Sequence, residues 1–171
     1  MSLTDNSSYR RTRTAILEGA KSLIAERGIR ATTMIDIADR SEVSRATLYN
    51  HFRDKGTVLR GVIESETQRL CALIAQSPDL TQPSIEISHD GALAMVRNSE
   101  PEILARLVST QSDPLWQMVE ESLKSALGSQ IQAQLAMRWL IGQVFAPLTQ
   151  AQSHEQALAI KAALAGLINQ K

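Results

Sequence analysis

Residues 32–59 read TTMIDIADRSEVSRATLYNHFRDKGTVL and contain two short helical patterns with a polar turn between them. In the first pattern, Thr33 can cap the helix, and Asp36 three residues later can complete a capping box. After the turn, Ser44 can cap a second helix over residues 45–51. Two short helices joined by a four-residue turn predict a helix-turn-helix unit, whose second helix lies in the major groove of DNA.

Longer helical patterns flank this unit. A helix is expected to begin at Arg10, after the polar residues 1–9, which we expect to be frayed. Its apolar side chains fall on one face: Ile16, Leu17, Ala20, Leu23 and Ile24. Gly28 follows as a stop signal. On the other side of the unit, Asp54 can cap a long helix that leads away from it.

The outward side chains of residues 45–51 are the candidate DNA contacts. Leu48 and Phe52 lie one turn apart and can face the core, which leaves polar side chains on the other faces. Arginine can pair with a guanine edge, and threonine, tyrosine and histidine can hydrogen-bond to bases or phosphates. Thr33 and Lys55, each at the start of a helix, can contact further phosphates. The predicted DNA-binding residues are Thr33, Ser44, Arg45, Ala46, Thr47, Tyr49, Asn50, His51 and Lys55. A solvated helix face is the alternative.

These residues resemble the signature of TetR-family repressors. The signature has an apolar helix, Gly, a Thr-Thr pair before Ile-Ala, a turn ending in Val-Ser, then Leu-Tyr-x-His-Phe and a Lys that starts the next helix. The match runs from about Ala15 to Val62 without an insertion. The resemblance implies an all-helical homodimer that binds palindromic operators and usually releases them when a small ligand binds. Beyond residue 65 it implies architecture and little chemistry.

Two positions depart from the signature. Glu42 stands in the turn where the family commonly has Gly, and at a positive φ it costs about 1 kcal/mol relative to Gly. Gly56 stands where the family often has Glu, and Gly in a first helical turn costs up to about 1 kcal/mol. Both departures leave the motif intact.

The remainder of the chain also has helical patterns. Aromatic residues make up only 4% of the chain, so the core depends on aliphatic side chains and Met, which favours packed helices over a sheet. Pro101 and Pro114 suit first helical positions, and Gly128 suits a helix end. Residues 77–91 are predicted to form a loop followed by a short helix. The sequence has no strand pattern and predicts an all-α fold of about nine helices.

The last two helices are expected to form a dimer interface. Residues 130–147 are apolar over most of the helix girth, so that helix must be buried on more than one side. Residues 154–169, opened by a capping box of Ser153 and Gln156, are rich in Ala and Gly. A chain of 171 residues cannot easily bury both helices within itself. Pairing them with the same helices of a second copy gives a four-helix interface.

Large side chains of the C-terminal part are candidates for binding a small-molecule effector, because such pockets are mostly apolar. They are Met95, Trp116, Arg138, Trp139 and Phe145. Plain core packing is the alternative for each apolar member, and an interface or buried ion pair is the alternative for Arg138. Cys71 is either a redox sensor or, as we favour, a small buried hydrophobe.

Charge is unevenly distributed, although the net charge is zero. Residues 1–60 carry 11 Lys and Arg against 7 Asp and Glu, and the remainder carries the reverse. The excess of basic residues in this N-terminal part indicates a polyanionic partner. Arg10, Arg11 and Arg13 can follow DNA as an arm, or form an ordinary solvated run.

Several function classes are disfavoured. A single cysteine excludes an intrachain disulfide, and the chain has no zinc-ligand spacing, so no cofactor is expected. No catalytic constellation argues for an enzyme. The chain lacks a signal peptide and a membrane-length apolar stretch, which predicts a cytoplasmic protein.

We therefore expect a DNA-binding domain over residues 1–55 and a ligand-binding and dimerisation domain over residues 56–171. The expected function is transcriptional repression by a homodimer that a small molecule releases from double-stranded DNA. The alternative is a helical coregulator of the same fold that binds a protein partner and lacks operator binding.

Overall fold

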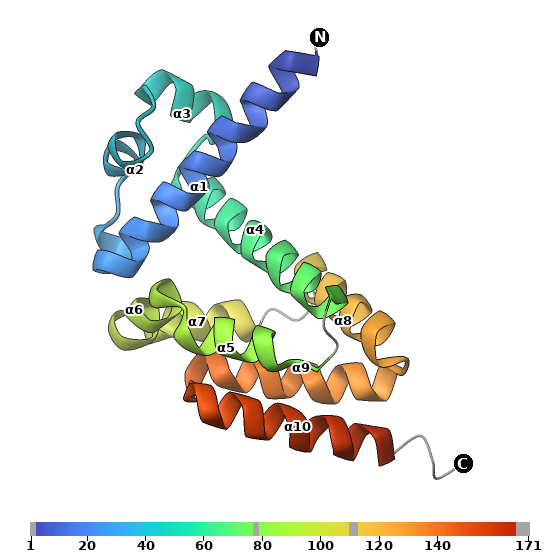
Figure 1. The fold of residues 1–171 in the computed structure, drawn as a ribbon. Coiled ribbons are helices and arrows are strands. Elements are labelled where there is room, and N and C mark those ends of the chain that lie inside the picture. Colours follow the sequence, from blue (N-terminus) through green and yellow to red (C-terminus); the bar gives the residue numbers. More distant parts are fainter. Residues whose placement is uncertain (1–2, 77–78, 110–112, 167–171) are drawn as a thin grey trace.

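The computed structural model describes residues 3–76, 79–109 and 113–166. Over these ranges the chain forms ten α-helices and no strand, which confirms the predicted all-α fold. Figure 1 shows a small head at the upper left, a long helix that descends from it, and a body of packed helices below. A membrane-crossing helix is absent from the described ranges, since none combines the required length with enough apolar character.

The head is built around one apolar cluster. Its elements are α1 (Leu3–Ala31), α2 (Met34–Arg40), α3 (Arg45–His51) and the first turns of α4 (Lys55–Gln76). The cluster contains four residues of the predicted apolar face of α1, together with residues of α2, α3 and α4: Ile16, Leu17, Ala20, Leu23, Ile37, Ala38, Leu48, Phe52 and Val58. The fifth residue of that face, Ile24, packs instead with Val96 and Leu104 of the body. Since Val58 belongs to α4, the head core continues past residue 55; the domain boundary itself stays a prediction.

Local capping fixes the ends of the short helices as the sequence predicts. Thr33 and Asp36 form a reciprocal capping box at the start of α2. Ser44 Oγ accepts from the backbone N–H of Thr47 at 3.0 Å and caps α3. In the turn between them, Glu42 has a φ of 54°, so the glutamate occupies the left-handed conformation that glycine would favour.

The first helix begins earlier than predicted. Helix α1 starts at Leu3, so residues 3–9 are helical and not frayed. The polar composition of these residues gives a weak helix propensity, which tertiary contacts override. One such contact is the ring of Tyr9, which stacks on the ring of His51 with a centroid separation of 4.1 Å. Gly28, with φ of 84°, breaks the helical path as predicted.

The body contains six helices. They are α5 (Thr81–His89), α6 (Gly91–Ser99), α7 (Pro101–Ser109), α8 (Pro114–Leu127), α9 (Gln130–Phe145) and α10 (Gln150–Gly166). Helix α4 packs against α8, α8 against α9, and α5 against both α9 and α10. At the bottom of Figure 1, α9 and α10 run antiparallel beside one another.

The prediction of a loop followed by a short helix over residues 77–91 is confirmed in the part of that range that the structure describes. Helix α5 begins at Thr81, and Asp90 then caps α6 by accepting from the N–H of Leu93 at 2.8 Å. The inward face of α5 carries Ser84 and Ser88, so an apolar period is missing from its sequence. Helix α6, which follows at Gly91, has no counterpart among the predicted helices and accounts for the difference between about nine helices and ten. Residues 77–78 lie outside the described residues.

The start of α10 also differs from the prediction. The helix begins at Gln150, and its capping box is formed by Thr149 and Gln152 instead of Ser153 and Gln156. Ser153 is buried within the helix, and Gln156 accepts a hydrogen bond from the indole of Trp139 at 3.0 Å. Helix α9 ends at Phe145, two residues before the predicted end. The predicted end of the last helix, residues 167–169, lies outside the described residues.

A buried polar cluster joins α5 to α9. Ser84 Oγ and Ser88 Oγ both donate to Gln143 Oε1, at 2.8 and 3.1 Å. Ser88 Oγ in turn accepts from the backbone N–H of Leu148 at 3.1 Å. All three polar side chains are buried, and these bonds compensate for their removal from water.

Candidate nucleic-acid interface

The outer surface of α3 combines a buried anchor with exposed polar side chains. Leu48 is fully buried in the head core, and Phe52 covers the C-terminal end of the helix. Four side chains that the sequence predicts to contact DNA are exposed: Arg45, Ala46, Tyr49 and Asn50. The Tyr49 side chain is 55% exposed, although it is large and mostly apolar. Arg45 has no hydrogen-bond or ion-pair partner among the residues that the structure describes.

The residues at the starts of the two short helices are partly used for capping. Thr33 and Ser44 are exposed, while Thr47 is half-buried. The Thr33 hydroxyl donates to Asp36 Oδ2 at 2.6 Å, and the hydroxyls of Ser44 and Thr47 lie 2.8 Å apart. Hydrogen bonds from Thr33 lower the pKa of Asp36, with a smaller contribution from the nearby Arg27 guanidinium. These groups hold the helix ends and still face solvent.

Ion pairs hold α2 against α1. The Arg40 guanidinium donates to both carboxylate oxygens of Glu26, at 2.6 and 2.7 Å. A second ion pair joins the two helices, with a guanidinium nitrogen of Arg27 3.0 Å from Asp36 Oδ2. Exposed pairs of this kind add little stability, but the two-pronged geometry of arginine and carboxylate fixes orientation.

His51 is less accessible than the sequence suggests. Its ring is half-buried between Tyr9, on which it stacks, and Phe52. Burial, and secondarily the Arg13 guanidinium, lower the pKa of His51 below its usual value of 6.5. The imidazole Nδ1 is buried and has no hydrogen-bond partner among the described residues. The lowered pKa favours the neutral ring, and the stacking on Tyr9 makes His51 a packing element between α1 and α3.

Lys55 lies close to the backbone of the first helix. Its ammonium donates to the carbonyls of Ile29 and Thr32 at 3.1 and 2.9 Å, with a third contact of 3.4 Å to the carbonyl of Arg30. These contacts account for its three hydrogen-bond donors. A phosphate contact by Lys55 would have to replace one of them.

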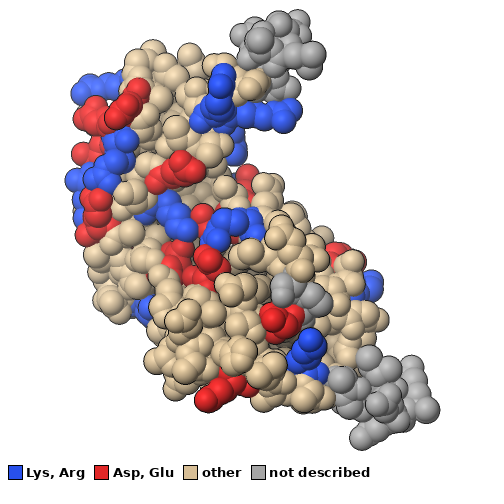
Figure 2. All heavy atoms as spheres, in the orientation of Figure 1, with Lys and Arg blue, Asp and Glu red and all other residues tan. Residues whose placement is uncertain are grey.

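The N-terminal part of α1 places arginines next to α3. Arg11 is exposed, while the Arg13 guanidinium lies 5.2 Å from the centre of the Phe52 ring and 3.9 Å from the carboxylate of Glu64. The upper part of the molecule in Figure 2, where α1 and α3 lie, carries several Lys and Arg side chains, and acidic side chains mix with basic ones on its left edge. Arg13 is thus partly engaged within the protein.

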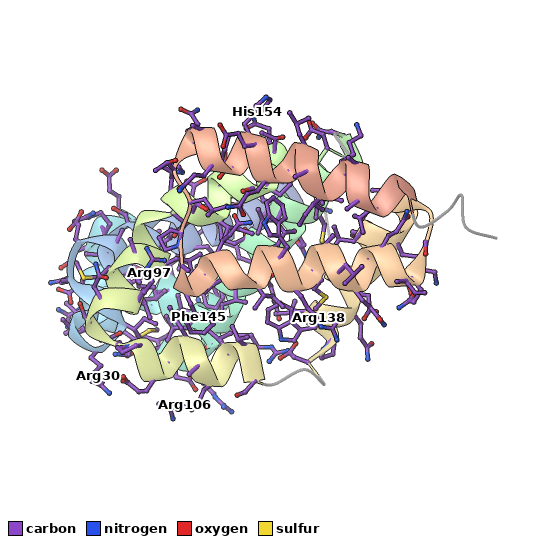
Figure 3. All side chains as sticks on the ribbon, turned by 90° about the horizontal axis from the view of Figure 1, so that it is seen from below. Arg30, Arg97, Arg106, Arg138, Phe145 and His154 are labelled. Atoms are coloured by element: carbon purple, nitrogen blue, oxygen red, sulfur yellow. The ribbon has the colours of Figure 1, made fainter. Side chains whose placement is uncertain are left out.

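The five candidate effector residues lie on α6, α8 and α9. Met95, Trp116 and Trp139 are half-buried on three different helices. Arg138 is exposed and donates to the carbonyl of Gln134, and Phe145 is 44% exposed. Figure 3 shows Arg138 and Phe145 at separate positions along α9.

Neither of two open grooves among the described residues contains any of the five candidates. One, of about 430 Å³, lies between α1 and the α5–α6 junction, and the other, of about 450 Å³, lies between α4 and α8. Cys71 is half-buried, with its thiol 3.9 Å from the carbonyl of Met118.

Sequence reasoning missed Tyr9 and Glu100. Tyr9 lay in a segment expected to be frayed, and no local pattern links it to His51. Glu100 is buried against the backbone of residues 29 and 30, about seventy positions earlier in the chain. A contact at that separation leaves no periodic signal in one sequence.

Comparisons with known proteins agree with this geometry. Residues 16–62 match the family described as bacterial regulatory proteins, tetR family. The chain is 29% identical over 159 residues to the HTH-type transcriptional repressor KstR2 of Rhodococcus jostii, covering 80% of this chain and 78% of that one. It is 34% identical over 74 residues to the HTH-type transcriptional regulator TtgR of Pseudomonas putida, covering 42% of this chain and 35% of that one.

Solved structures show the same fold. Salmonella enterica GusR has a TM-score of 0.60 and 22% identity, with 92% of this chain and 95% of that chain covered. The TetR family repressor AlkX from Dietzia has a TM-score of 0.58 and 18% identity, with 89% of this chain and 97% of that chain covered. The matched relatives are described as regulators and not as enzymes.

Proposed function

Since the chain is a DNA-binding transcriptional regulator of the TetR family, we propose that it represses transcription as a homodimer on a palindromic operator. The observation that carries the proposal is the surface of α3, where a fully buried Leu48 orients exposed Arg45, Tyr49 and Asn50 outward. A regulator of this kind acts where the DNA is, so we place it in the cytoplasm.

The α3 side chains suit recognition in a major groove. Arg45 can pair with guanine O6 and N7, and Asn50 can pair with an adenine edge. Tyr49, Thr47 and Ser44 have hydroxyls that can contact phosphates or bases. Thr33, Ala46 and His51 complete the proposed contact surface. Lys55 is the weakest member, because its donors are used within the protein.

The exposed faces of α9 and α10 support the homodimer. On α9 the outward residues Ile131, Leu135, Arg138 and Phe145 recur at spacings of four, three and seven, the pattern of a helix-pairing stripe. On α10, Leu158 is 51% exposed, and Glu155 lies on the same side of the helix. Side chains of this size rarely remain in water along a whole helix face.

Arg138 gives the proposed dimer a specific polar contact. It is an exposed cation within an otherwise largely apolar stripe, and Glu155 is an exposed anion on the adjacent helix. In a twofold arrangement of these two helices, the Arg138 of each copy can reach an acidic side chain of the other. Such a pair would favour one register of the interface.

A small-molecule effector is proposed for the body, which a TetR-type regulator uses to control release. Met95, Trp116 and Trp139 remain the candidate contacts, because they are half-buried on α6, α8 and α9. Arg138 and Phe145 can serve both an effector and the dimer. A ligand shifts operator binding only as far as its affinity differs between the two states of the dimer.

The test starts from duplexes that the full-length protein selects out of a random-sequence pool. We expect an inverted repeat with half-sites about one helical turn apart. On that duplex, Arg45→Ala is expected to weaken binding about tenfold or more and to relax sequence preference at one position.

Lys124→Ala is the matched control, because it removes one exposed positive charge far from α3. It should leave both affinity and sequence preference unchanged. If Arg45→Ala and Tyr49→Ala bind like Lys124→Ala, with the same salt dependence, then α3 does not read DNA. The coregulator hypothesis would then replace operator binding.

A further inference from the structure

The segment that joins α1 to α2 receives a carboxylate from the body. Glu100 Oε2 accepts from the backbone N–H of Ile29 at 2.9 Å, and Glu100 Oε1 accepts from the N–H of Arg30 at 2.8 Å. Both oxygens of one carboxylate therefore bind two successive amides. This two-amide arrangement resembles the concave anion sites that consecutive N–H groups form in other proteins.

Gly28 makes this contact possible. Its φ of 84° turns the chain so that the next two amides point the same way, a conformation that side chains disfavour. A Cβ at residue 28 would also lie 3.2 Å from Glu100 Oε1. Backbone direction and free space thus both require glycine here.

The contact is buried. Glu100 is 4% exposed, at the C-terminal cap of α6 and directly before Pro101. A buried carboxylate needs strong donors to offset its loss of water, and two backbone amides supply them. The neighbouring Glu102 is different, because it is exposed and pairs with the side chain of Arg30.

The opposite side of the same segment is held by the head. The Lys55 ammonium donates to the carbonyls of Ile29 and Thr32, and the Thr32 hydroxyl donates to the carbonyl of Gly28 at 2.8 Å. The amides of residues 29 and 30 thus face a body carboxylate, and the carbonyls of residues 29 and 32 face the first residue of α4. The next residue, Thr33, caps α2, so the position of this segment sets where α2 and α3 begin.

Helix α6 also reaches the proposed dimer helices. The Arg97 guanidinium donates to the carbonyl of Val144, near the C-terminal end of α9, at 2.9 Å. Figure 3 shows Arg97 beside that end of α9. One short helix therefore contacts α9 through Arg97 and the head through Glu100.

We propose that Glu100 is a positioning residue for DNA binding: its carboxylate fixes the α1–α2 segment, and thereby α3, relative to the body. The inference rests on the proposed operator binding. In a dimer, both heads must meet DNA at one separation, so a head that turns freely on its body loses affinity for the paired half-sites.

The experiment compares Glu100→Gln with Glu102→Gln in the full-length protein. Both variants remove one negative charge from the same segment. The loss of charge repulsion from DNA should therefore be the same in both. The glutamine at position 100 keeps one acceptor but turns an NH2 group toward an amide N–H. On the duplex selected by the wild-type protein, we expect Glu100→Gln to bind about tenfold more weakly. Glu102→Gln should bind within about twofold of the wild type.

A second readout separates positioning from stability. Affinity is measured where urea titrations show each variant to be fully folded, so a purely stabilising role would leave the affinity of Glu100→Gln unchanged. Hydrogen exchange of the peptide containing Ile29 and Arg30 should accelerate in Glu100→Gln alone. If Glu100→Gln does not fold, Glu100→Asp is used, which keeps the charge but is one methylene shorter; it should also lose affinity.

Equal affinity of folded Glu100→Gln and Glu102→Gln for the selected duplex would overturn the positioning role and leave operator binding intact. If the wild-type protein selects no duplex, the proposed function fails, and the positioning role fails with it.

Discussion

Gly61 lies where α4 crosses the head, and replacing it with alanine should destabilise the protein. A Cβ at this position would lie 2.9 Å from Leu17 Cδ2 and 3.0 Å from Phe52 Cε1. Leu17 of α1 and Phe52 at the end of α3 are both 5% exposed. The new methyl group would therefore require a shift of two side chains that are packed in the head core.

The expected size follows from two opposing effects. Gly→Ala within a helix gains about 1 kcal/mol in helix propensity. Overpacking a filled core costs about 1–3 kcal/mol. With two contacts below the normal range, we expect the cost to prevail, with a net loss of about 1–2 kcal/mol in the free energy of unfolding.

Urea unfolding followed by circular dichroism, at one fixed protein concentration, measures this loss. The control is Gly91→Ala, whose new Cβ would lie at an ordinary 3.5 Å from Ala25 Cβ and should be tolerated. A Gly61→Ala protein as stable as the wild type would show that the head core can expand without cost, contrary to the close approach described here.

Three further predictions concern the turn, the histidine and the dimer. Glu42→Gly should raise the free energy of unfolding by about 1 kcal/mol in urea titrations, because φ is 54° at that residue; an unchanged or lower value would argue against strain there. The pKa of His51 is lowered by burial, so the unfolded chain binds the proton more readily. Stability should therefore be complete above pH 6.5 and fall as the pH drops below 6.5 toward the folded pKa, and His51→Gln should flatten this part of a pH series of urea titrations. Leu135→Glu, on the exposed face of α9, should shift sedimentation toward the monomer, whereas Lys124→Glu, at an exposed residue of α8, serves as a charge-changing control. A dimer that survives Leu135→Glu would contradict the proposed interface.

Features that depend on residues close together in the sequence could be predicted. The capping box of Thr33 and Asp36, the cap at Ser44 and the glycine stop at residue 28 are confirmed. Each depends on groups at most four residues apart, so its physical cause is visible in a short stretch. The same holds for the buried face of α1, which one period describes.

Features that depend on distant residues could not be predicted. Lys55 was expected to meet phosphate, and only the folded chain brings the carbonyls of residues 29–32 within reach of its ammonium. No pattern in the sequence indicated that Glu100 accepts hydrogen bonds from the amides of Ile29 and Arg30. The partner of Ser84 and Ser88 on α5 could not be predicted either, because both hydroxyls donate to Gln143, far along the chain.

The serine–glutamine cluster limits how the body can move. When two helices meet only through apolar side chains, a sliding motion exchanges one apolar contact for another and breaks no hydrogen bond. Moving α5 by a turn along α9 would instead strand two hydroxyls and an amide in a dry interior. We therefore expect any rearrangement of the body, including one caused by the proposed effector, to carry α5 and α9 together and to be taken up at contacts between aliphatic side chains.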